Sequence, residues 1–298
     1  MLNNIDFVGR WRTWFAISGV LLLLGVLFIL VRGMNFGIDF EGGAKFTVTG
    51  IEGSASIEEV QAALPEDLRE SAVVQSLGDG GYEVRTPVIN QAESRETRDG
   101  LKETLGAEVS VQNISPTFGG QVRNQALQAV AAALIVIVVF ISIRFEFAFA
   151  ISAMVAVIHD ILITVGFYAI WGREVNLVTV VAVLTVLGYS LYDTIIIFDR
   201  IRENTPSVGY NKRRFEEMIN VSISQVVRRS IYTSISTLIP ITALLIFGES
   251  TLSDFAFALL VGILAGTYSS IFIAAPTLAL YKSWRAEAEK SKAAAQRA

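Results

Sequence analysis

Six long stretches of this chain are almost free of Asp, Glu, Lys and Arg, and they restrict its fold more than any other feature. A helix that rises about 1.5 Å per residue needs about 20 mainly apolar residues to cross the hydrocarbon core of a bilayer. Each stretch meets or nearly meets that length, and 52% of the 298 residues are hydrophobic. The sequence therefore predicts a polytopic α-helical membrane protein with six transmembrane helices, over 13–31, 124–143, 147–172, 175–198, 230–248 and 255–281.

The first stretch has two interpretations, because Arg10 and Arg12 precede it as the basic region of a signal peptide would. The apolar run is long for a signal peptide, however, and Arg32 follows where a small-residue cleavage site is expected. We therefore expect an uncleaved transmembrane helix over 13–32.

Lysines and arginines gather on one side of the expected helices, which sets the orientation of the chain. Fifteen of the 24 basic residues lie at the N-terminus, near Arg144, in the loop after the fourth helix or in the tail. Both termini are therefore expected in the cytoplasm. The expected division is a cytoplasmic N-terminus at 1–12, helix 1 at 13–32, an extracytoplasmic domain at 33–122, helices 2–6 at 123–281 and a cytoplasmic tail at 282–298. The cytoplasmic loop at 199–229 is amphipathic: its part 211–229 has apolar residues at helical spacing, which predicts a helix lying on the inner membrane surface.

The extracytoplasmic domain has short segments that alternate between strand and helix patterns. Alternating apolar residues indicate strands, a Ser56/Glu59 capping box indicates the start of a helix, and Gly78-Asp-Gly-Gly indicates a hairpin. The resulting order is β-α-β-β-α-β, which predicts a small α+β domain of ferredoxin-like arrangement between helices 1 and 2. Its expected elements cover 44–50, 56–64, 71–77, 82–88, 91–105 and 107–115.

Charge and composition exclude several kinds of function. Between residues 36 and 120 the chain carries 15 acidic and 6 basic residues, which argues against nucleic acid as a partner. This domain has no His, no Cys and no Gly-rich phosphate loop after a strand, so we expect no catalytic residues and no enzyme activity. The whole chain has one His and no Cys, and we therefore expect neither a metal site nor a cofactor.

Asp193 stands inside the fourth apolar stretch, near its cytoplasmic end. A charged side chain at a helix centre costs roughly 2.5–3.5 kcal/mol on insertion scales, so it suggests a functional site. Two interpretations stay open: a structural acid that is hydrogen-bonded between helices, or a group that binds and releases protons beside a cation. Arg228 and Arg229 are candidates for the cation, although the positive-inside bias alone also places arginines at the start of the fifth helix.

His159 and Asp160 lie at the midpoint of the third stretch. Adjacent side chains on a helix point about 100° apart, so the two need not touch. A proton-relay or helix-coupling role and simple hydrogen bonding between helices are both open for this pair. Gly262 and Gly266 form a GxxxG pattern, which predicts close packing between helices.

Five segments carry recognisable motifs: NFGIDFEGG (35–43), HDILITVGFYA (159–169), GYSLYDTIIIFDRIREN (188–204), RSIYTSISTL (229–238) and GTYSSIFIAAP (266–276). Together they resemble the SecD/SecF family of protein-export membrane proteins, which is related to the resistance-nodulation-division proton-driven exporters. The resemblance covers all six expected helices and the position of the outer domain. Asp193-Thr194-Ile195 favours the SecF branch over SecD, whereas Tyr192 departs from the small polar residue that is common there.

This resemblance implies a subunit that works with SecD beside the SecYEG channel in the bacterial cytoplasmic (inner) membrane. The pair is expected to use the proton motive force to aid late export of unfolded polypeptides, after the motor SecA has pushed them into the channel. The resemblance also implies a proton-path role for Asp193 and an essential role for Arg229, while His159 and Asp160 match family motif positions. The alternatives are a scaffold that stabilises SecD or SecYEG without moving protons, and an independent small-molecule antiporter.

Overall fold

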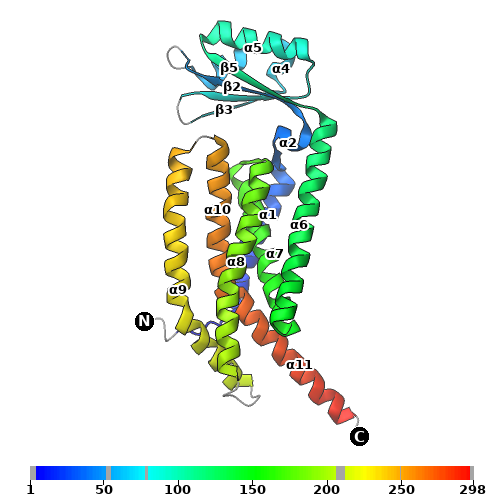
Figure 1. Ribbon diagram of the computed structural model, residues 1–298, viewed down its shortest axis with the longest axis vertical. Coiled ribbons are helices and arrows are strands. Elements are labelled where there is room, and N and C mark those ends of the chain that lie inside the picture. Colours follow the sequence, from blue (N-terminus) through cyan, green and yellow to red (C-terminus); the bar gives the residue numbers. More distant parts are fainter. Residues whose placement is uncertain (1–4, 52–54, 78–79, 206–211, 249, 296–298) are drawn as a thin grey trace.

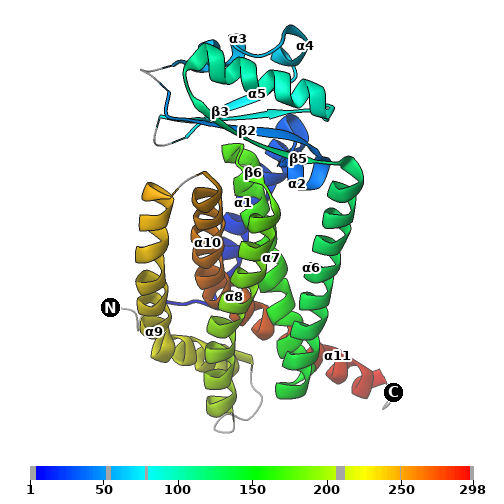
Figure 2. The same ribbon diagram turned by 45° about the horizontal axis from the view of Figure 1, so that its top comes forward.

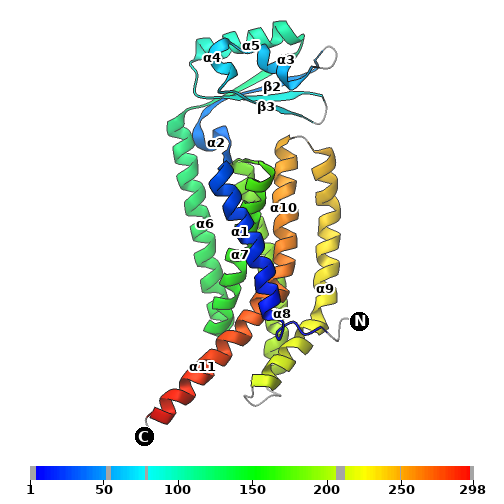
Figure 3. The same ribbon diagram turned by 180° about the vertical axis from the view of Figure 1, so that it is seen from behind.

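The computed structural model describes residues 5–51, 55–77, 80–205, 212–248 and 250–295. It shows an elongated molecule in which long helices run side by side and a small sheet domain covers one end of the bundle (Figure 1). The start of the first helix and the end of the last helix both lie away from the sheet domain (Figure 3). The sheet domain and these two helix ends are therefore on opposite sides of the bundle.

Six helices in the described part of the chain are long and apolar enough to cross a membrane, which confirms the six predicted helices. The last of them is built from two α-helices joined by a π-helical turn. The helices are α1 (Trp11–Arg32), α6 (Pro116–Arg144), α7 (Phe147–Trp171), α8 (Leu177–Asn204), α9 (Lys212–Phe247), and α10 (Ser250–Ser269) continued through the π turn η3 (Ser270–Ala274) into α11 (Ala275–Ala295).

The outer domain is a four-stranded antiparallel sheet with strand order β3-β4-β2-β5. The α-helices α3 and α5 lie on the face of the sheet that points away from the membrane helices (Figure 2). Their apolar side chains pack on Phe46, Val48 and Val84, which are fully buried. The elements are β2 (Gly43–Thr49), α3 (Ile57–Ala62), α4 (Glu66–Arg69), β3 (Val73–Ser76), β4 (Tyr82–Thr86), α5 (Gln91–Leu105) and β5 (Glu108–Ile114).

Capping residues fix where the helices of this domain begin. Ser56 and Glu59 form the predicted capping box at the start of α3, and Asn90 forms a second one with Glu93 at the start of α5. Gly106 adopts a left-handed conformation and ends α5. Residues 78–79, in the predicted hairpin between β3 and β4, lie outside the described part of the chain.

A second, two-stranded sheet joins the outer domain to the membrane helices. Strand β1 (Asn35–Phe36) pairs in parallel with β6 (Glu174–Val175), which lies between α7 and α8. The short helix α2 (Ile38–Glu41) follows β1 and leads into the outer sheet through Gly42 and Gly43, both with positive φ. The sequence did not predict this sheet, because each strand is only two residues long.

Close helix packing holds the bundle together. At the crossing of α1 and α7, a Cβ added to Gly25 would lie 2.8 Å from Cα of Gly166, so the two backbones are in direct contact. Gly262 and Gly266 of α10 pack on α8, against Val186 and Ser190 respectively. A side chain at any of these glycines would push the helices apart.

Two helices extend beyond the apolar stretches from which they were predicted. Helix α6 begins at Pro116, before the expected outer boundary at 122, because Ser115 caps it and proline suits its first position. In the cytoplasmic loop expected at 199–229, α8 runs to Asn204, and the helix predicted at 211–229 forms the first part of α9, which starts at Lys212. The apolar stripe of that segment packs into the protein core with Phe198 and Ile201 rather than on a lipid surface, and it comprises Phe215, Met218, Ile219, Ile223 and Val227.

Candidate functional site

Asp193 lies on the face of α8 that points into the helix bundle. Asp193 is 1% exposed, and Ser190 and Thr194 on the same helix are also buried. Neither of its carboxylate oxygens has a hydrogen-bond partner. A buried carboxylate without a hydrogen-bond partner is unfavourable, which distinguishes Asp193 from an acid that joins helices through hydrogen bonds.

Two neighbouring residues of α9 act on this carboxylate. They are Ser230, through its hydroxyl, and Arg229, through its positive charge. The Ser230 hydroxyl is buried and has no hydrogen-bond partner of proper geometry. The site therefore holds a buried acid, a buried hydroxyl and a nearby cation, without hydrogen bonds that lock them together.

The expected pairing of Asp193 with Arg229 is not a direct ion pair in this structure. Instead, Nη2 of Arg229 donates a hydrogen bond to the hydroxyl oxygen of Tyr192 at 3.1 Å. Tyr192 precedes Asp193 but points outward, with 51% of its surface exposed. The guanidinium is thus held on the outer face of α8, while the carboxylate faces inward. Arg228, the other candidate cation, is exposed.

Asp160 is equally buried but fully hydrogen-bonded. Its Oδ2 accepts hydrogen bonds from the hydroxyls of Ser190 at 2.5 Å and Ser269 at 2.8 Å. Its Oδ1 lies 2.9 Å from Nδ1 of His159. Three partners from α7, α8 and α10 therefore converge on this carboxylate, which fits a fixed position in the bundle.

His159 extends the same network to α1. The two side chains of the His159–Asp160 pair do touch, and the other ring nitrogen, Nε2, lies 3.0 Å from the hydroxyl of Ser18. Tyr268 stacks beside the imidazole and donates to the carbonyl oxygen of Trp14 at 2.8 Å. Four helices of the bundle are thus joined by one polar network.

The network continues toward Asp193 through the π turn. The hydroxyls of Thr194 and Ser270 lie 2.7 Å apart, and Ser270 also donates to the carbonyl oxygen of Ser190 at 3.3 Å. Single π turns inside α-helices occur frequently at functional sites. The serines of this network were not identified as site residues from the sequence, because isolated serines in apolar helices carry no distinctive pattern.

In the described part of the chain, no group of three or more His, Cys, Asp or Glu side chains has the geometry to hold a metal ion. The candidate site is accordingly the pair of buried aspartates with their hydroxyl, imidazole and guanidinium neighbours.

Two family models match this chain. "Protein export membrane protein SecD/SecF, C-terminal" matches residues 97–284, and "SecD/SecF GG Motif" matches residues 27–49. The second range contains Gly42 and Gly43, which lead from α2 into the outer sheet. The matches therefore include most of the membrane helices and the junction with the outer domain.

Known proteins show the same similarity. The chain is 36% identical to "Protein translocase subunit SecF" of Streptomyces coelicolor, over 92% of this chain and 76% of the relative. It is 34% identical to the protein of that name from Calditerrivibrio nitroreducens, over 95% of this chain and 96% of the relative. A crystal structure of SecDF, a translocon-associated membrane protein from Thermus thermophilus, matches with a TM-score of 0.86 and 33% identity, over 94% of this chain and 39% of that chain.

These matches agree with the six membrane helices and with the fold of the bundle. The chain therefore belongs to the SecD/SecF family of protein-export membrane proteins and, within it, to the SecF translocase subunits.

Proposed function

We propose that this chain, with a SecD partner, uses the proton motive force to assist late translocation of unfolded polypeptides through SecYEG. Its membership of the SecF subunits supports a role in the protein translocase. SecD is supported as the partner because this chain covers only 39% of the solved SecDF chain, and the rest of that chain has no counterpart here. The location is the bacterial cytoplasmic membrane, with both termini inside and the acidic outer domain outside, as the distribution of basic residues indicates.

One observation carries the proposal: Asp193 is a buried carboxylate with no hydrogen-bond partner, beside the cation of Arg229. When the carboxylate is charged, it attracts the guanidinium toward the inner face of α8. When it is protonated, that attraction is lost and Arg229 keeps its hydrogen bond to Tyr192. Proton exchange at Asp193 thus shifts α8 and α9 relative to each other.

The energy available is sufficient for such a shift. One charge that crosses a potential of 100 mV supplies about 2.3 kcal/mol. That free energy changes the ratio of two conformations by about 50-fold. A single proton can therefore shift the equilibrium between two helix arrangements whose free energies differ modestly.

Movement of α8 has a direct route to the outer domain. The first backbone N–H of α8, that of Leu177, donates to Oδ2 of Asp39 in α2 at 3.0 Å. Helix α2 in turn leads into the outer sheet, which has the strand order of the ferredoxin-like arrangement to which we assign this domain. The outer domain is the part that shifts against an emerging polypeptide.

The test is proton-gradient-dependent completion of secretory-protein translocation into membrane vesicles. Wild type is compared with Asp193→Asn and Arg229→Ala, with SecD association and expression measured in parallel. Loss of the gradient's stimulation in an intact complex supports energy coupling through Asp193 and Arg229. Undiminished stimulation in Asp193→Asn contradicts it and leaves the chain as a scaffold.

A further inference from the structure

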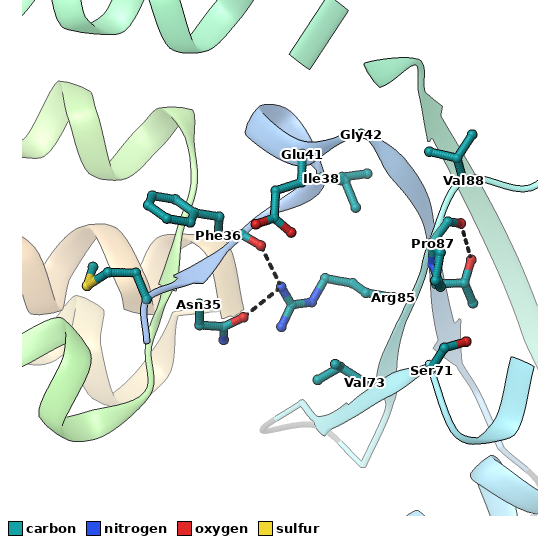
Figure 4. Close-up of a pocket in the computed structure, with 12 residues that line it drawn as sticks. Asn35, Phe36, Ile38, Glu41, Gly42, Ser71, Val73, Arg85, Pro87 and Val88 are labelled. Carbon is teal, nitrogen blue, oxygen red and sulfur yellow. Dashed lines mark hydrogen bonds between the residues drawn. The ribbon is translucent and has the colours of Figure 1, made fainter. Parts of the chain in front are cut away.

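Arg85 connects the outer sheet to the membrane helices. It lies on β4, on the face of the sheet that points toward the bundle, and is 6% exposed. Its Nη1 lies 3.4 Å from Oε2 of Glu174 in β6. The same nitrogen donates to Oδ1 of Asn35 at 3.2 Å and to the carbonyl oxygen of Phe36 at 3.5 Å (Figure 4). One side chain of the outer domain thus holds both strands of the small junction sheet.

Glu174 is buried by the junction itself. It is 6% exposed although it lies between α7 and α8, outside the membrane-spanning helices. Oε1 of Glu174 packs so closely against Gly37 that a Cβ added to this glycine would collide with it. Glu174 therefore loses contact with water only while the outer domain and the segment around Gly37 stay against the helices.

The charges around Glu174 do not fully compensate its burial. Burial raises the pKa of Glu174 to about 7, because the loss of water outweighs the attraction of Arg85. Glu83 and Asp254 act in the same direction as burial, and Lys45 acts with Arg85. Arg173 forms an ion pair with Asp254 at 3.0 Å, and Lys45 forms one with Glu83 at 3.3 Å.

The contact between the two parts is incomplete on one side. Nη2 of Arg85 is buried without a hydrogen-bond partner, and Nε makes no hydrogen bond but lies 3.9 Å from Oε1 of Glu83 as part of an ion pair. A cavity of about 380 Å³ lies beside the guanidinium, lined by residues of the outer domain and of the linking segment such as Met34, Ile38 and Val88 (Figure 4). A buried donor without a hydrogen-bond partner is unfavourable, so this junction is not built for permanent closure.

The direction of the pH effect follows from linkage. When the outer sheet separates from the helices, Glu174 faces water and titrates near its ordinary pKa of 4.5. The closed junction binds the proton more strongly, so protonation favours closure. Closure is strongest below the ordinary pKa of Glu174 and weakens as the pH rises through about 7.

We propose that Arg85 and Glu174 form a proton-sensitive latch, closed by acid on the outer side, which holds the outer domain against the membrane helices. The inference deepens the proposed function and rests on it for the idea that the outer domain moves. It involves a different carboxylate from Asp193, at the outer end of the bundle. An acidic exterior then keeps the domain docked, and loss of that acidity releases it.

The experiment measures the distance between the outer domain and the bundle as the pH changes. The chain contains no Cys, so a pair of introduced cysteines carries spin labels at defined positions. Suitable positions are Lys102 on α5 and Phe247 at the outer end of α9, because both side chains are exposed. Electron–electron distance distributions are recorded for the full chain in proteoliposomes between about pH 5.5 and 8.5.

We expect a single short distance at pH 5.5 and a long-distance population that grows as the pH rises toward about 7 and levels off above it. The docking equilibrium should weaken by about thirty-fold over this range. Glu174→Gln, which resembles the protonated form, should keep the short distance at every pH. Glu41→Gln, which changes an exposed acid at the same junction, should behave as wild type.

Two results overturn the latch: a wild-type distribution that does not change with pH, or a Glu174→Gln variant that titrates as wild type does. Neither result bears on Asp193, because the measurement involves no translocation and no transmembrane gradient. Loss of gradient-driven stimulation in Asp193→Asn, conversely, does not depend on the latch.

Discussion

The Ser190 hydroxyl donates a hydrogen bond to Oδ2 of Asp160 at 2.5 Å. Ser190 also lies on the buried face of α8 that carries Asp193. The buried face of α8 therefore contacts Asp160, whose carboxylate is fully hydrogen-bonded. The same face carries Asp193, whose carboxylate has no hydrogen-bond partner. The two buried aspartates differ in their surroundings, and we expect them to differ in role: Asp160 fixes the bundle and Asp193 exchanges protons.

Replacement of the Asp160 carboxyl group should weaken the bundle. Asp160→Asn loses acceptor capacity for the Ser190 and Ser269 hydroxyls, so we expect a free energy of unfolding lower by about 1–3 kcal/mol. Thermal melting of the purified protein checks this. Ser152→Ala on the same helix is the control, because that hydroxyl donates to the carbonyl oxygen of Ala148 within the helix. Equal melting temperatures for the two variants would contradict the role assigned to Asp160.

His159 should matter for stability more than for proton coupling. Both ring nitrogens lie at hydrogen-bond distance from fixed groups, Asp160 and Ser18, and neither has Asp193 as its partner. His159→Phe keeps the ring beside Tyr268, and we expect a lower melting temperature with gradient stimulation retained per assembled complex. Vesicle translocation, normalised to the amount of complex, measures this. Abolished stimulation with an unchanged melting temperature would instead make His159 a relay.

The crossing of α1 and α7 should tolerate no side chain. Gly25→Leu places atoms where the backbone of Gly166 lies, so we expect a loss of several kcal/mol or failure to accumulate in the membrane. Gly19→Leu is a matched control on the same helix, because an added Cβ there has no neighbour within 4 Å. Expression level and melting temperature of the two variants are compared. Similar behaviour would show that the crossing is not tightly packed.

Local sequence signals predicted the elements that they directly encode. The helix expected at 91–105 has those bounds in the structure, because Asn90 caps its start and Gly106 its end. The junction sheet escaped prediction because Asn35 pairs with Glu174, far along the chain, and no local pattern marks two-residue strands. Sequence reasoning likewise found an amphipathic stripe in 211–229 but not what covers it, since protein core and lipid demand the same apolar side chains.

The candidate site was predictable only in part, for a similar reason. Asp193, His159 and Asp160 are conspicuous because charged or polar groups are rare in apolar helices. The hydrogen bond between Arg229 and Tyr192 depends on where α8 and α9 face each other, which spacing along the chain does not specify. The serine partners of Asp160 come from two other helices and became visible only in the folded bundle.

The most direct test of the account asks whether Asp193 itself binds a proton. Infrared difference spectra between acidic and alkaline pH are recorded for the protein in proteoliposomes, in a Glu174→Gln background. Wild-type Asp193 should give a carbonyl band of a buried protonated carboxyl group, absent in Asp193→Asn and retained in Asp160→Asn. A band that persists in Asp193→Asn and disappears in Asp160→Asn would contradict the roles assigned to the two aspartates.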